Sequence, residues 1–533
     1  MKIPFKEKLE KLDHKKVLKI SLVLAVSGLF MSLIFVPTLV NTIVKFLTIL
    51  KPGRFIRSKH EKPVVFRYKI FLWNVTNPDD IMYNRAKPKL QEVGPYVFEQ
   101  TKQKVETFDN DTEDSYSFDL INVYRFSKEL SYPLTGEEQL NMLNLVLVSG
   151  MVKIFEERPH LLDTVMRGMD LVFDNPKSIF LSMTADEFIH NGIFLNCDQH
   201  EFAGKAVCAE FRDTKTLKMI DGDKTRLRYK WFDKLNNSVQ ARYTLLRGNR
   251  DTNDIGRIIR VNDEPMQNIY KHDSKCNVIN GTDKTFFPPF QRKRETIWVY
   301  SHDACISFPM VYSHSQFLKG AHTAFKSLYL SDPLMSPNCN CNPYTGCKIP
   351  KGTIDMHSCL DIFVLGSFPH FYLAEPSIFE TIDGMEPQEN IHRTGIFFDL
   401  LTGVPVLSLE RFQVNFRLKR ILKYPIMANL PYDVWIPAFW YEETFTPLKP
   451  DLALMVFSQI AKFLGIFSGY NLFVIGLLGC GLAGAKHFLT RNHSQPLGIS
   501  TIQQVKSVET EKADEDENDV SEMNNYNRIN YMP

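Results

Sequence analysis

The chain has 533 residues, with 63 Lys and Arg against 61 Asp and Glu and a formal net charge of +2. This near balance provides no basic excess of the kind that nucleic-acid binding requires, so the composition argues against that class of partner. Hydrophobic residues make up 44% of the chain. They are distributed unevenly, and two dense apolar runs lie near the two ends of the sequence.

The first apolar run covers residues 20–40 and follows a lysine-rich segment, 1–19. A helix needs about 20 apolar residues to cross the hydrocarbon core of a bilayer, and this run supplies them. The run is too long for a signal peptide and no small-residue cleavage site follows it, so we expect a retained transmembrane helix. Its basic flank predicts a cytoplasmic N-terminus.

The long middle segment, 41–462, is expected to form an extracellular domain. It contains every cysteine except Cys480, and disulfides form in that oxidising compartment. It also contains Asn-x-Ser/Thr sequons, which are glycosylated on the lumenal or extracellular side. The predicted glycosylation sites are Asn74, Asn110, Asn236 and Asn280.

Strand patterns occur at several points in this domain. Residues 411–419 alternate, with apolar side chains from Phe412 to Leu418 on one side and polar side chains on the other. A period of two predicts a strand of an antiparallel sheet with one face in water. Residues 64–75 and 297–300 are rich in β-branched and aromatic side chains and are also expected to form strands. The domain therefore mixes strands with helices.

Residues 137–193 have apolar side chains at helical spacing, interrupted by Pro159 and Pro176. The pattern predicts several short helices joined at these prolines. The apolar stripe, which includes Leu140, Leu147 and several methionines, has two interpretations. It is ordinary core, or it is an exposed cap that receives apolar ligands, since methionine-rich surfaces adapt to varied partners.

The eight cysteines of this domain are expected to form disulfides. Eight thiols allow many pairings, and spacing alone does not choose among them. The alternative is a zinc cluster, but the C-x-C spacing and the oxidising compartment argue against it. That cluster would consist of Cys339, Cys341, Cys347, His357 and Cys359.

The second apolar run, 463–485, is followed by Lys486 and Arg491. It is long enough for a second transmembrane helix, and its basic flank predicts a cytoplasmic tail, 486–533. Acidic residues are dense at 509–522, which is typical of a disordered segment. We therefore expect a two-pass protein of the plasma membrane with both termini in the cytoplasm.

Small residues recur in the second run. Gly465 and Gly469 form a GxxxG step, which allows close packing either with the first run or with a second copy of the chain. A G-x-G-x-x-G match at 479–484 lacks the preceding strand of a nucleotide-binding motif, so nucleotide binding is rejected. Cys480 within it is either acylated or an unmodified membrane thiol.

No sequence typical of a zinc protease, a serine hydrolase or a P-loop enzyme occurs, and the histidines are scattered without ligand spacing. His302 beside Asp303 could suggest a general base, but no nucleophile is tied to the pair. We therefore expect a protein that is not an enzyme, with no metal and no cofactor.

Five short motifs stand out: LKPG at 50–53, QEVGPYVF at 91–98, CNVINGTDKTFFPPF at 276–290, ENIHRT at 389–394 and PAFWYE at 437–442. With the two apolar runs, they resemble the class B scavenger receptor family, and within it the insect branch of sensory neuron membrane proteins. The resemblance covers nearly the whole chain. It implies an α+β ectodomain with a large antiparallel β-barrel-like core, an apolar tunnel and a membrane-distal helical cap.

The resemblance also implies how the cysteines pair. The pairs carried over are Cys276–Cys339, Cys305–Cys359 and Cys341–Cys347. Two cysteines fall outside this pattern, and their short separation favours a fourth, local bridge, Cys197–Cys208.

In function, the resemblance implies that the cap binds lipidic ligands and that the tunnel, opening near Leu50 and Trp440, leads them toward the membrane. We expect a cell-surface receptor or co-receptor for hydrophobic odorants such as fatty-acid-derived pheromones, with an odorant receptor complex as partner. The lysine that contacts acyl carboxylates in the family falls near Lys177. A general scavenger or lysosomal lipid-handling receptor is the alternative, and an adhesion glycoprotein without a small ligand is a third class.

Overall fold

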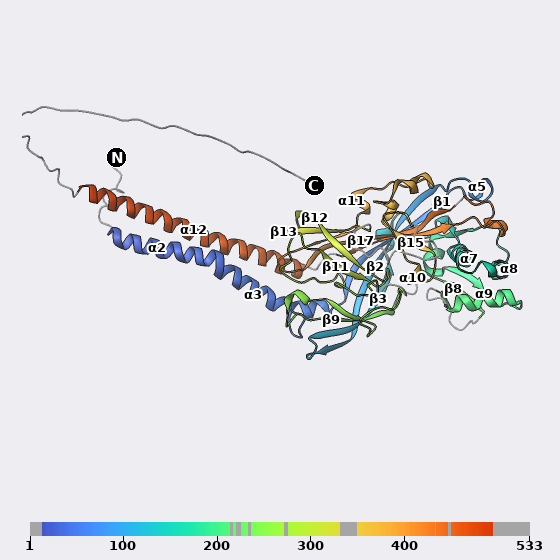
Figure 1. Cartoon of the computed structure of the whole chain (residues 1–533), viewed down its shortest axis with the longest axis horizontal. Coiled ribbons are helices and arrows are strands. Elements are labelled where there is room, and N and C mark those ends of the chain that lie inside the picture. The colour runs from blue at the N-terminus through green and yellow to red at the C-terminus, as the bar shows by residue number, and fades with distance from the viewer. Residues whose placement is uncertain are drawn as a thin grey trace, which may run out of the picture. The chain divides into compact units, whose positions relative to one another are not determined.

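Figure 1 shows the computed structural model of the chain, which divides into two compact units. One unit combines Met1–Val26 with Phe473–Pro533, and the other is Ser27–Leu472. The structure describes residues 13–213, 217–219, 225–232, 236–270, 275–330, 349–431, 433–445 and 449–493.

Two helices long and apolar enough to cross a membrane, His14–Thr48 and Leu452–Arg491, coincide with the two apolar runs. The first consists of α2 (His14–Phe30), a π-helical turn (Met31–Phe35) and α3 (Val36–Thr48). Pro37 is the second residue of α3, and because proline has no N–H the hydrogen-bond ladder shifts near this turn. The second belongs to α12 (Lys449–His493), whose 45 residues span roughly 67 Å, more than twice the ~30 Å hydrocarbon core.

Glycines of α12 pack closely against the first helix. A Cβ added to Gly465 would lie 2.5 Å from Cγ1 of Val36, and one added to Gly469 would lie 2.8 Å from the backbone nitrogen of Ser32. Gly476, in the other unit, is equally restricted. The GxxxG step therefore packs against the first helix of the same chain, which is one of the two partners considered for it.

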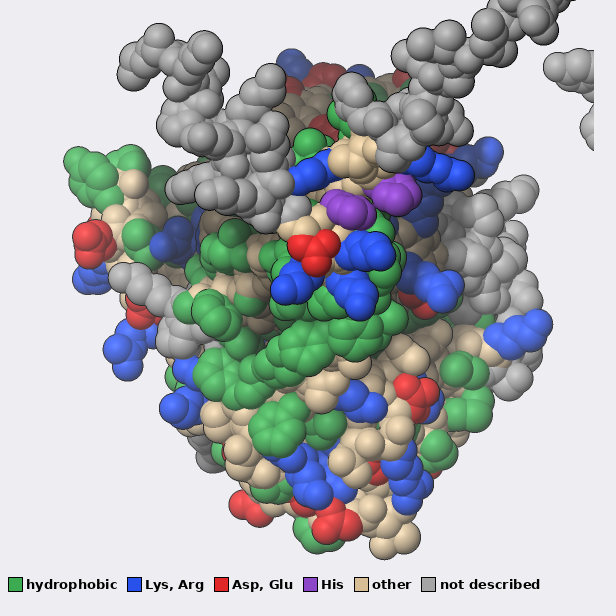
Figure 2. Space-filling view, turned by 90° about the vertical axis from the view of Figure 1, so that its left-hand side faces the viewer, with side chains coloured by type: hydrophobic (Ala, Val, Ile, Leu, Met, Phe, Trp, Pro, Cys, Tyr) green, Lys and Arg blue, Asp and Glu red, His purple; other side chains and the backbone are tan. Residues whose placement is uncertain are grey.

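Basic side chains gather at the ends of the two helices in the smaller unit. His14 and His487 lie side by side, with ring centroids 5.4 Å apart, near Lys15 and Lys486 in the sequence. Figure 2 shows Lys, Arg and His side chains together on this side, beside hydrophobic ones. Apolar side chains along the helices are exposed, as expected for helices that face lipid.

The larger unit is built on a 13-stranded sheet with the order β10-β9-β3-β2-β1-β18-β17-β16-β13-β12-β11, to which β14 and β15 attach through β17. Its strand pairs are antiparallel, and the sheet curls into a nearly closed barrel, so the predicted antiparallel barrel-like core is confirmed. The strands are β1 (Val64–Val75), β2 (Leu90–Asn110), β3 (Ser115–Phe126), β9 (Ser238–Leu246), β10 (Ile258–Val261), β11 (Ile297–Ser301), β12 (Ile306–Leu318), β13 (Ala321–Leu328), β14 (Thr353–Asp355), β15 (Val364–Ser367), β16 (Gly395–Phe398), β17 (Pro405–Leu418) and β18 (Val434–Phe445).

β17 contains the alternating segment as far as Leu418, but the polar face of this segment is not in water. Gln413 and Asn415 are fully buried. The Gln413 amide donates to the side-chain oxygen of Asn415 at 2.9 Å, and the Asn415 amide donates to the carbonyl of Leu365 at 3.0 Å. The expectation of one wet face is therefore wrong, because alternation does not distinguish water from a hydrogen-bonded polar layer under β15.

The segment 137–193 forms helices in its middle and strands at its ends. The helical prediction is right for α7 (Leu145–Glu157) and α8 (Leu162–Val172), which Pro159 separates. It is wrong at the ends, where β4 (Gln139–Leu143) pairs with β5 (Phe180–Thr184). Leu140 is buried in this pair, since cross-strand pairing satisfies the backbone better there than an isolated turn of helix.

Shorter elements complete the larger unit. A second small sheet has the order β6-β8-β7, and α9 packs on α8, where a Cβ at Gly168 would lie 2.5 Å from the carbonyl oxygen of Ala203. These elements are α4 (Phe55–His60), α5 (Pro78–Asn84), α6 (Lys128–Ser131), β6 (Ile193–Asn196), α9 (Phe202–Asp213), β7 (Leu217–Met219), β8 (Arg226–Tyr229), α10 (His357–Leu360) and α11 (Glu389–His392).

Candidate functional site

A pocket of about 240 Å³ lies between α7, α8 and α9 and is called the cap pocket below. The helices pack closely elsewhere: Leu147 and Met151 of α7 are fully buried in the main core, which supports the core interpretation for that part of the apolar stripe. Other apolar side chains of the three helices line the pocket. They include Val146, Ile154, Val165, Met169, Val207 and Phe211.

Lys153 is a buried cation in the wall of the cap pocket. It comes from α7, is 9% exposed, and places its Nζ 2.8 Å from Oδ2 of Asp361. Arg158 and Glu210, also in the lining, form a looser pair at 3.6 Å. The pocket is therefore an apolar space with one buried ammonium group whose carboxylate partner is half exposed.

A second space of about 690 Å³, the barrel cavity, lies inside the barrel. Aromatic rings form part of its wall: the ring of Tyr68 stacks on Tyr441 with centroids 5.2 Å apart and meets Tyr124 edge-on at 5.3 Å. Charged side chains form another part, so the lining is mixed and not uniformly apolar. These are Lys102, Lys104, Lys230, Asp283, Lys284, Asp303, Glu410, Arg411 and Glu443.

Lys104 is the most deeply placed cation of the barrel cavity. Its Nζ lies 2.5 Å from Nε2 of His60 and 3.6 Å from Oδ2 of Asp283. Burial lowers the pKa of Lys104 to about 8, with Asp283 opposing the shift. Burial and then the charge of Lys104 hold the pKa of His60 well below its usual range. His60 is therefore a neutral imidazole that accepts a hydrogen bond from the ammonium group.

Tyr229, the last residue of β8, lines both the cap pocket and the barrel cavity. Its side chain is 6% exposed, and burial raises its pKa above the usual range. The hydroxyl has no hydrogen-bond partner among the residues that the structure describes. A buried hydroxyl without a partner is costly, so this side chain is held at the common wall by packing.

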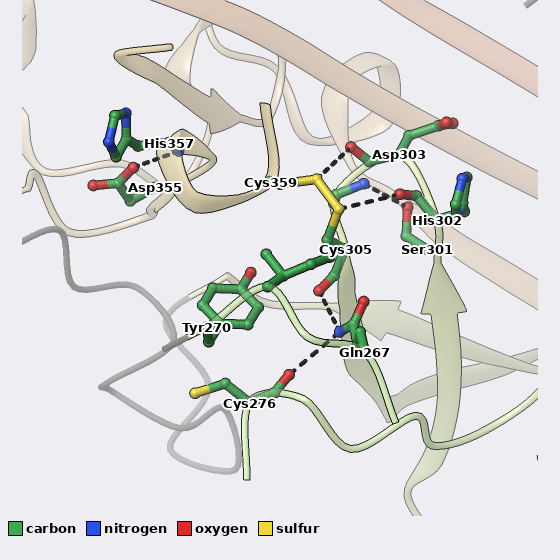
Figure 3. Close-up of a disulfide and its surroundings, with 12 residues drawn as sticks. Gln267, Tyr270, Cys276, Ser301, His302, Asp303, Cys305, Asp355, His357 and Cys359 are labelled. Atoms are coloured by element: carbon green, nitrogen blue, oxygen red, sulfur yellow. Dashed lines mark hydrogen bonds between the residues drawn. A yellow bond between two sulfur atoms is a disulfide. The ribbon is translucent and has the colours of Figure 1, made fainter. Parts of the chain in front are cut away.

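The disulfide Cys305–Cys359 lies in the wall of the barrel cavity (Figure 3). Beside it, the amide of Gln267 donates to the carbonyl of Cys305 at 2.7 Å and to that of Cys276 at 3.3 Å. Cys276 is also disulfide-bonded, but the expected partner Cys339 lies outside the described residues.

Of the remaining cysteines, some lie within the described residues and some outside them. Cys197 and Cys208 form the local bridge, which ties the end of β6 to α9. The proposed pair Cys341–Cys347, and with it most of the alternative zinc cluster, lies outside the described residues. Cys480 is a free thiol in α12.

Asp303 lies next to the disulfide, and its carboxylate points away from it in Figure 3. The side chain is exposed and lines the barrel cavity, as does that of His302. Asp303 forms no ion pair with any residue in the described part of the chain. The backbone carbonyl oxygens of His302 and Asp303 lie 3.5 Å from the Sγ atoms of Cys305 and Cys359. These two sulfurs are joined in the disulfide and are therefore not free nucleophiles.

The four sequons all lie in the larger unit. Asn236 is exposed, and Asn74, Asn110 and Asn280 are half buried. The side-chain oxygen of Asn74 accepts from the backbone N–H of Asn141 at 2.8 Å, while that of Asn236 accepts from Tyr124 N–H at 3.0 Å. Glycosylation at the four positions stays a prediction.

Three residues named for the ligand path line neither cavity. Lys177 is exposed after α8 and lines neither cavity, so its ligand role finds no support in this placement. Leu50 and Trp440 are buried and line neither cavity, and a tunnel opening near them stays a prediction. Lys153 was missed, although it is the one charged residue in the apolar segment 145–155.

Comparison with known proteins gives consistent matches. A family model described as the CD36 family matches residues 19–487. The chain is 32% identical over 467 residues to sensory neuron membrane protein 1 of Aedes aegypti, covering 86% of this chain and 84% of that protein. It is 31% identical to the protein of that name from Manduca sexta, covering 78% of this chain and 80% of the relative.

Proposed function

The chain belongs to the CD36 family, and on this premise we propose that it is a cell-surface receptor or co-receptor that captures hydrophobic odorants. In this proposal the ligands are lipidic, such as fatty-acid-derived pheromones, and pass to the bilayer or to an odorant receptor. The observation that supports it is the pair of ectodomain cavities that share Tyr229 as a wall residue.

The barrel cavity has the size of a small-molecule site, and the smaller cap pocket has a largely apolar lining. Small-molecule sites typically measure about 300–1,000 Å³ and combine apolar walls with a few polar groups. The barrel cavity, at about 690 Å³, falls in this range, and the smaller cap pocket adds about 240 Å³. Since each buried CH₂ contributes about 0.8 kcal/mol, a fourteen-carbon chain gains on the order of 10 kcal/mol before the costs of binding.

Lys153 supplies the polar contact in the cap pocket. Its ammonium group is buried against Asp361, and the half-exposed carboxylate can move toward water while a ligand head group takes its place. An acid would pair with the ammonium charge, and the oxygen of an ester or aldehyde would accept a hydrogen bond from it. The cap pocket thus accepts both acids and neutral derivatives.

The route from the cap pocket to the barrel cavity passes Tyr229. Because the hydroxyl makes no hydrogen bond within the described residues, moving the side chain breaks no polar contact there. A rotation of this one residue would join the two spaces. We propose that this joined space is the tunnel by which ligands leave the cap.

The orientation of the chain in the membrane is part of the same proposal. We propose that both termini lie in the cytoplasm and that the chain resides in the plasma membrane, since the basic residues at the helix ends favour the cytoplasmic side. A general scavenger or lysosomal lipid-handling receptor remains the alternative. The names of the relatives, sensory neuron membrane proteins, favour the chemosensory role.

The test uses the full chain expressed in insect cells and a fluorescent, uncharged hexadecyl probe. Cells that express it should take up the probe saturably and faster than control cells. Val165→Trp fills the cap pocket, which Val165 lines, and should abolish the difference, whereas Lys205→Trp on the exposed face of α9 should preserve it. Equal uptake by expressing and control cells would refute the proposal.

A further inference from the structure

Direct contacts fix the junction between the barrel and the two apolar helices. Leu401, in the turn between β16 and β17, packs against the buried valines of α3. On the other helix, the Gln459 amide of α12 donates to the carbonyl oxygen of His322 at 3.0 Å and to Oδ1 of Asp399 at 2.6 Å. Because Gln459 lies four residues before the second apolar run, this end of the barrel faces the bilayer that the helices cross.

The hairpin of β12 and β13 ends at this junction. Phe317 of β12 pairs with His322 of β13, and the backbone N–H of His322 donates to the side-chain oxygen of Gln459 at 3.0 Å. A Cβ added to Gly320 in the turn would lie 3.5 Å from Cγ2 of Val456. The tip of the hairpin therefore lies against α12, about two helical turns before the second apolar run begins.

Exposed apolar side chains surround the junction. Phe317 is 73% exposed, which for a single aromatic residue needs no explanation. On α12, however, Phe457 and Ile460 are 72% and 49% exposed. They share a helix face with Leu464 and Phe467 of the apolar run, which are 55% and 57% exposed. The lipid-facing stripe of α12 thus begins beside the hairpin and not at the start of the apolar run.

Lysines are the charged residues closest in sequence to the exposed phenylalanines of this junction. Lys45 precedes Phe46 of α3, Lys319 follows Phe317 by two residues, and Lys462 lies between Phe457 and the apolar run. The sequence contains no Asp or Glu at 36–50, 306–328 or 452–472. Aromatic rings and lysines are typical of the head-group layer, where the ring lies among the head groups and the ammonium group reaches lipid phosphate.

The backbone of the turn limits how deeply the hairpin can enter a bilayer. Leu318 pairs with Ala321, and the two residues between them, Lys319 and Gly320, both have positive φ, as in a type I′ turn. Hydrocarbon offers no partner for the N–H and C=O groups of such a turn. Head groups and their water do, so the tip can enter the head-group layer and no further.

We propose that the β12–β13 hairpin inserts its tip into the head-group layer of the leaflet on the ectodomain side, with the ring of Phe317 among the lipids and Lys319 on lipid phosphate. The partner of this surface is the bilayer, because the surface is continuous with the lipid-facing stripe of α12. The contact gives the barrel a third attachment beside the two helices and so restricts its tilt. It goes beyond the proposed function and does not depend on a ligand in either cavity.

The experiment places the photo-crosslinking amino acid p-benzoylphenylalanine at position 317 of the full chain in phosphatidylcholine nanodiscs. The lipid carries an alkyne on its acyl chain, so crosslinked protein is measured by in-gel fluorescence after irradiation. Lipid labelling from position 317 should exceed labelling from position 202 at least fivefold. Phe202 is the matched control, because it is 78% exposed on α9, which lies well apart from α3 (Figure 1).

Two further positions keep the result interpretable. The same amino acid in place of Phe463, inside the apolar run, is the positive control for lipid labelling. If position 317 does not tolerate the larger side chain, the exposed Lys319 of the same tip carries the crosslinker, with the same fivefold excess expected.

The outcomes decide between lipid and protein as the partner of the hairpin. Labelling from the tip no higher than labelling from position 202 would overturn the insertion. A crosslink from position 317 to a second copy of the chain, in place of lipid, would assign the surface to self-association and overturn the insertion as well. Neither outcome bears on the uptake of the hexadecyl probe, so failure here leaves the proposed function standing.

Discussion

The indole nitrogen of Trp440 donates a hydrogen bond of 2.7 Å to the carboxylate of Glu92. These residues belong to two of the motifs that identify the family, PAFWYE and QEVGPYVF. The same carboxylate oxygen lies 2.7 Å from Nε2 of His370, whose ring stacks on His392 of the ENIHRT motif with centroids 4.3 Å apart. Three distant motifs thus meet at one buried cluster outside both cavities, where they stabilise the barrel wall.

Glu92→Ala should destabilise the protein. The change leaves the N–H groups of Trp440 and His370 without their acceptor, and a buried donor without a partner costs about 1–3 kcal/mol. Thermal unfolding of the full chain in nanodiscs should show a clearly lower midpoint, with Glu99→Ala on an exposed face as control. Equal midpoints for the two variants would show that the cluster contributes no stability.

His392 should make stability fall on acidification. Burial, then the charges of His370 and Arg411, lower its pKa to about 4, with Glu92 opposing the shift. Its unfolded pKa is ~6.5, so the unfolded chain binds the proton first, and stability that is fully present above about pH 6.5 is lost as pH falls toward 4. The loss should be on the order of 2 kcal/mol.

The variant His392→Asn tests this dependence. Its side-chain oxygen can replace Nδ1, which accepts from the backbone N–H of Gln388 at 2.9 Å, but it does not titrate. Denaturant unfolding between pH 4 and 7 should therefore give a flatter profile than the wild type. A variant profile as steep as that of the wild type would place the titrating group elsewhere.

Lys153→Met should weaken ligand capture at the cap pocket. The substitution keeps an unbranched side chain of similar length but removes the ammonium group and leaves Asp361, which is half exposed and can be hydrated. We expect fatty acids to lose about tenfold in affinity, since a charge-assisted hydrogen bond contributes roughly 1.5–3 kcal/mol. Fluorescence titration measures this, with Lys205→Met as the exposed control; identical affinities for the two variants would exclude Lys153.

Tyr229→Ala should speed the passage of ligand from the cap to the bilayer. The change removes a side chain that lines both cavities, while the lysine of the cap pocket is untouched. Stopped-flow transfer of an uncharged hexadecyl probe to nanodisc lipid should become several times faster. Tyr229→Phe, which keeps the ring and removes only a hydroxyl without a described partner, should transfer at the wild-type rate, and equal rates for all three proteins would contradict a gate at this position.

The sequence predicted the two apolar helices, the antiparallel barrel and the helices on either side of Pro159, because these features depend on local periodicity or on motifs. It failed where a polar side chain is buried. The alternation at Gln413 and Asn415 looks the same whether the polar face meets water or β15. The lysine–carboxylate pairs of the cavity join residues as distant as Lys102 and Glu443, and only the strand order brings them together.

The central claim is that an alkyl ligand occupies the two ectodomain cavities, and photo-crosslinking tests it most directly. The full chain in nanodiscs is irradiated with an uncharged hexadecyl diazirine, and the labelled peptides are mapped by mass spectrometry with and without excess hexadecyl acetate. We expect labels on α7–α9 and on the strands that line the barrel cavity, and excess hexadecyl acetate should reduce them. Labels confined to the two apolar helices, or labels in the ectodomain that excess acetate does not reduce, would contradict it.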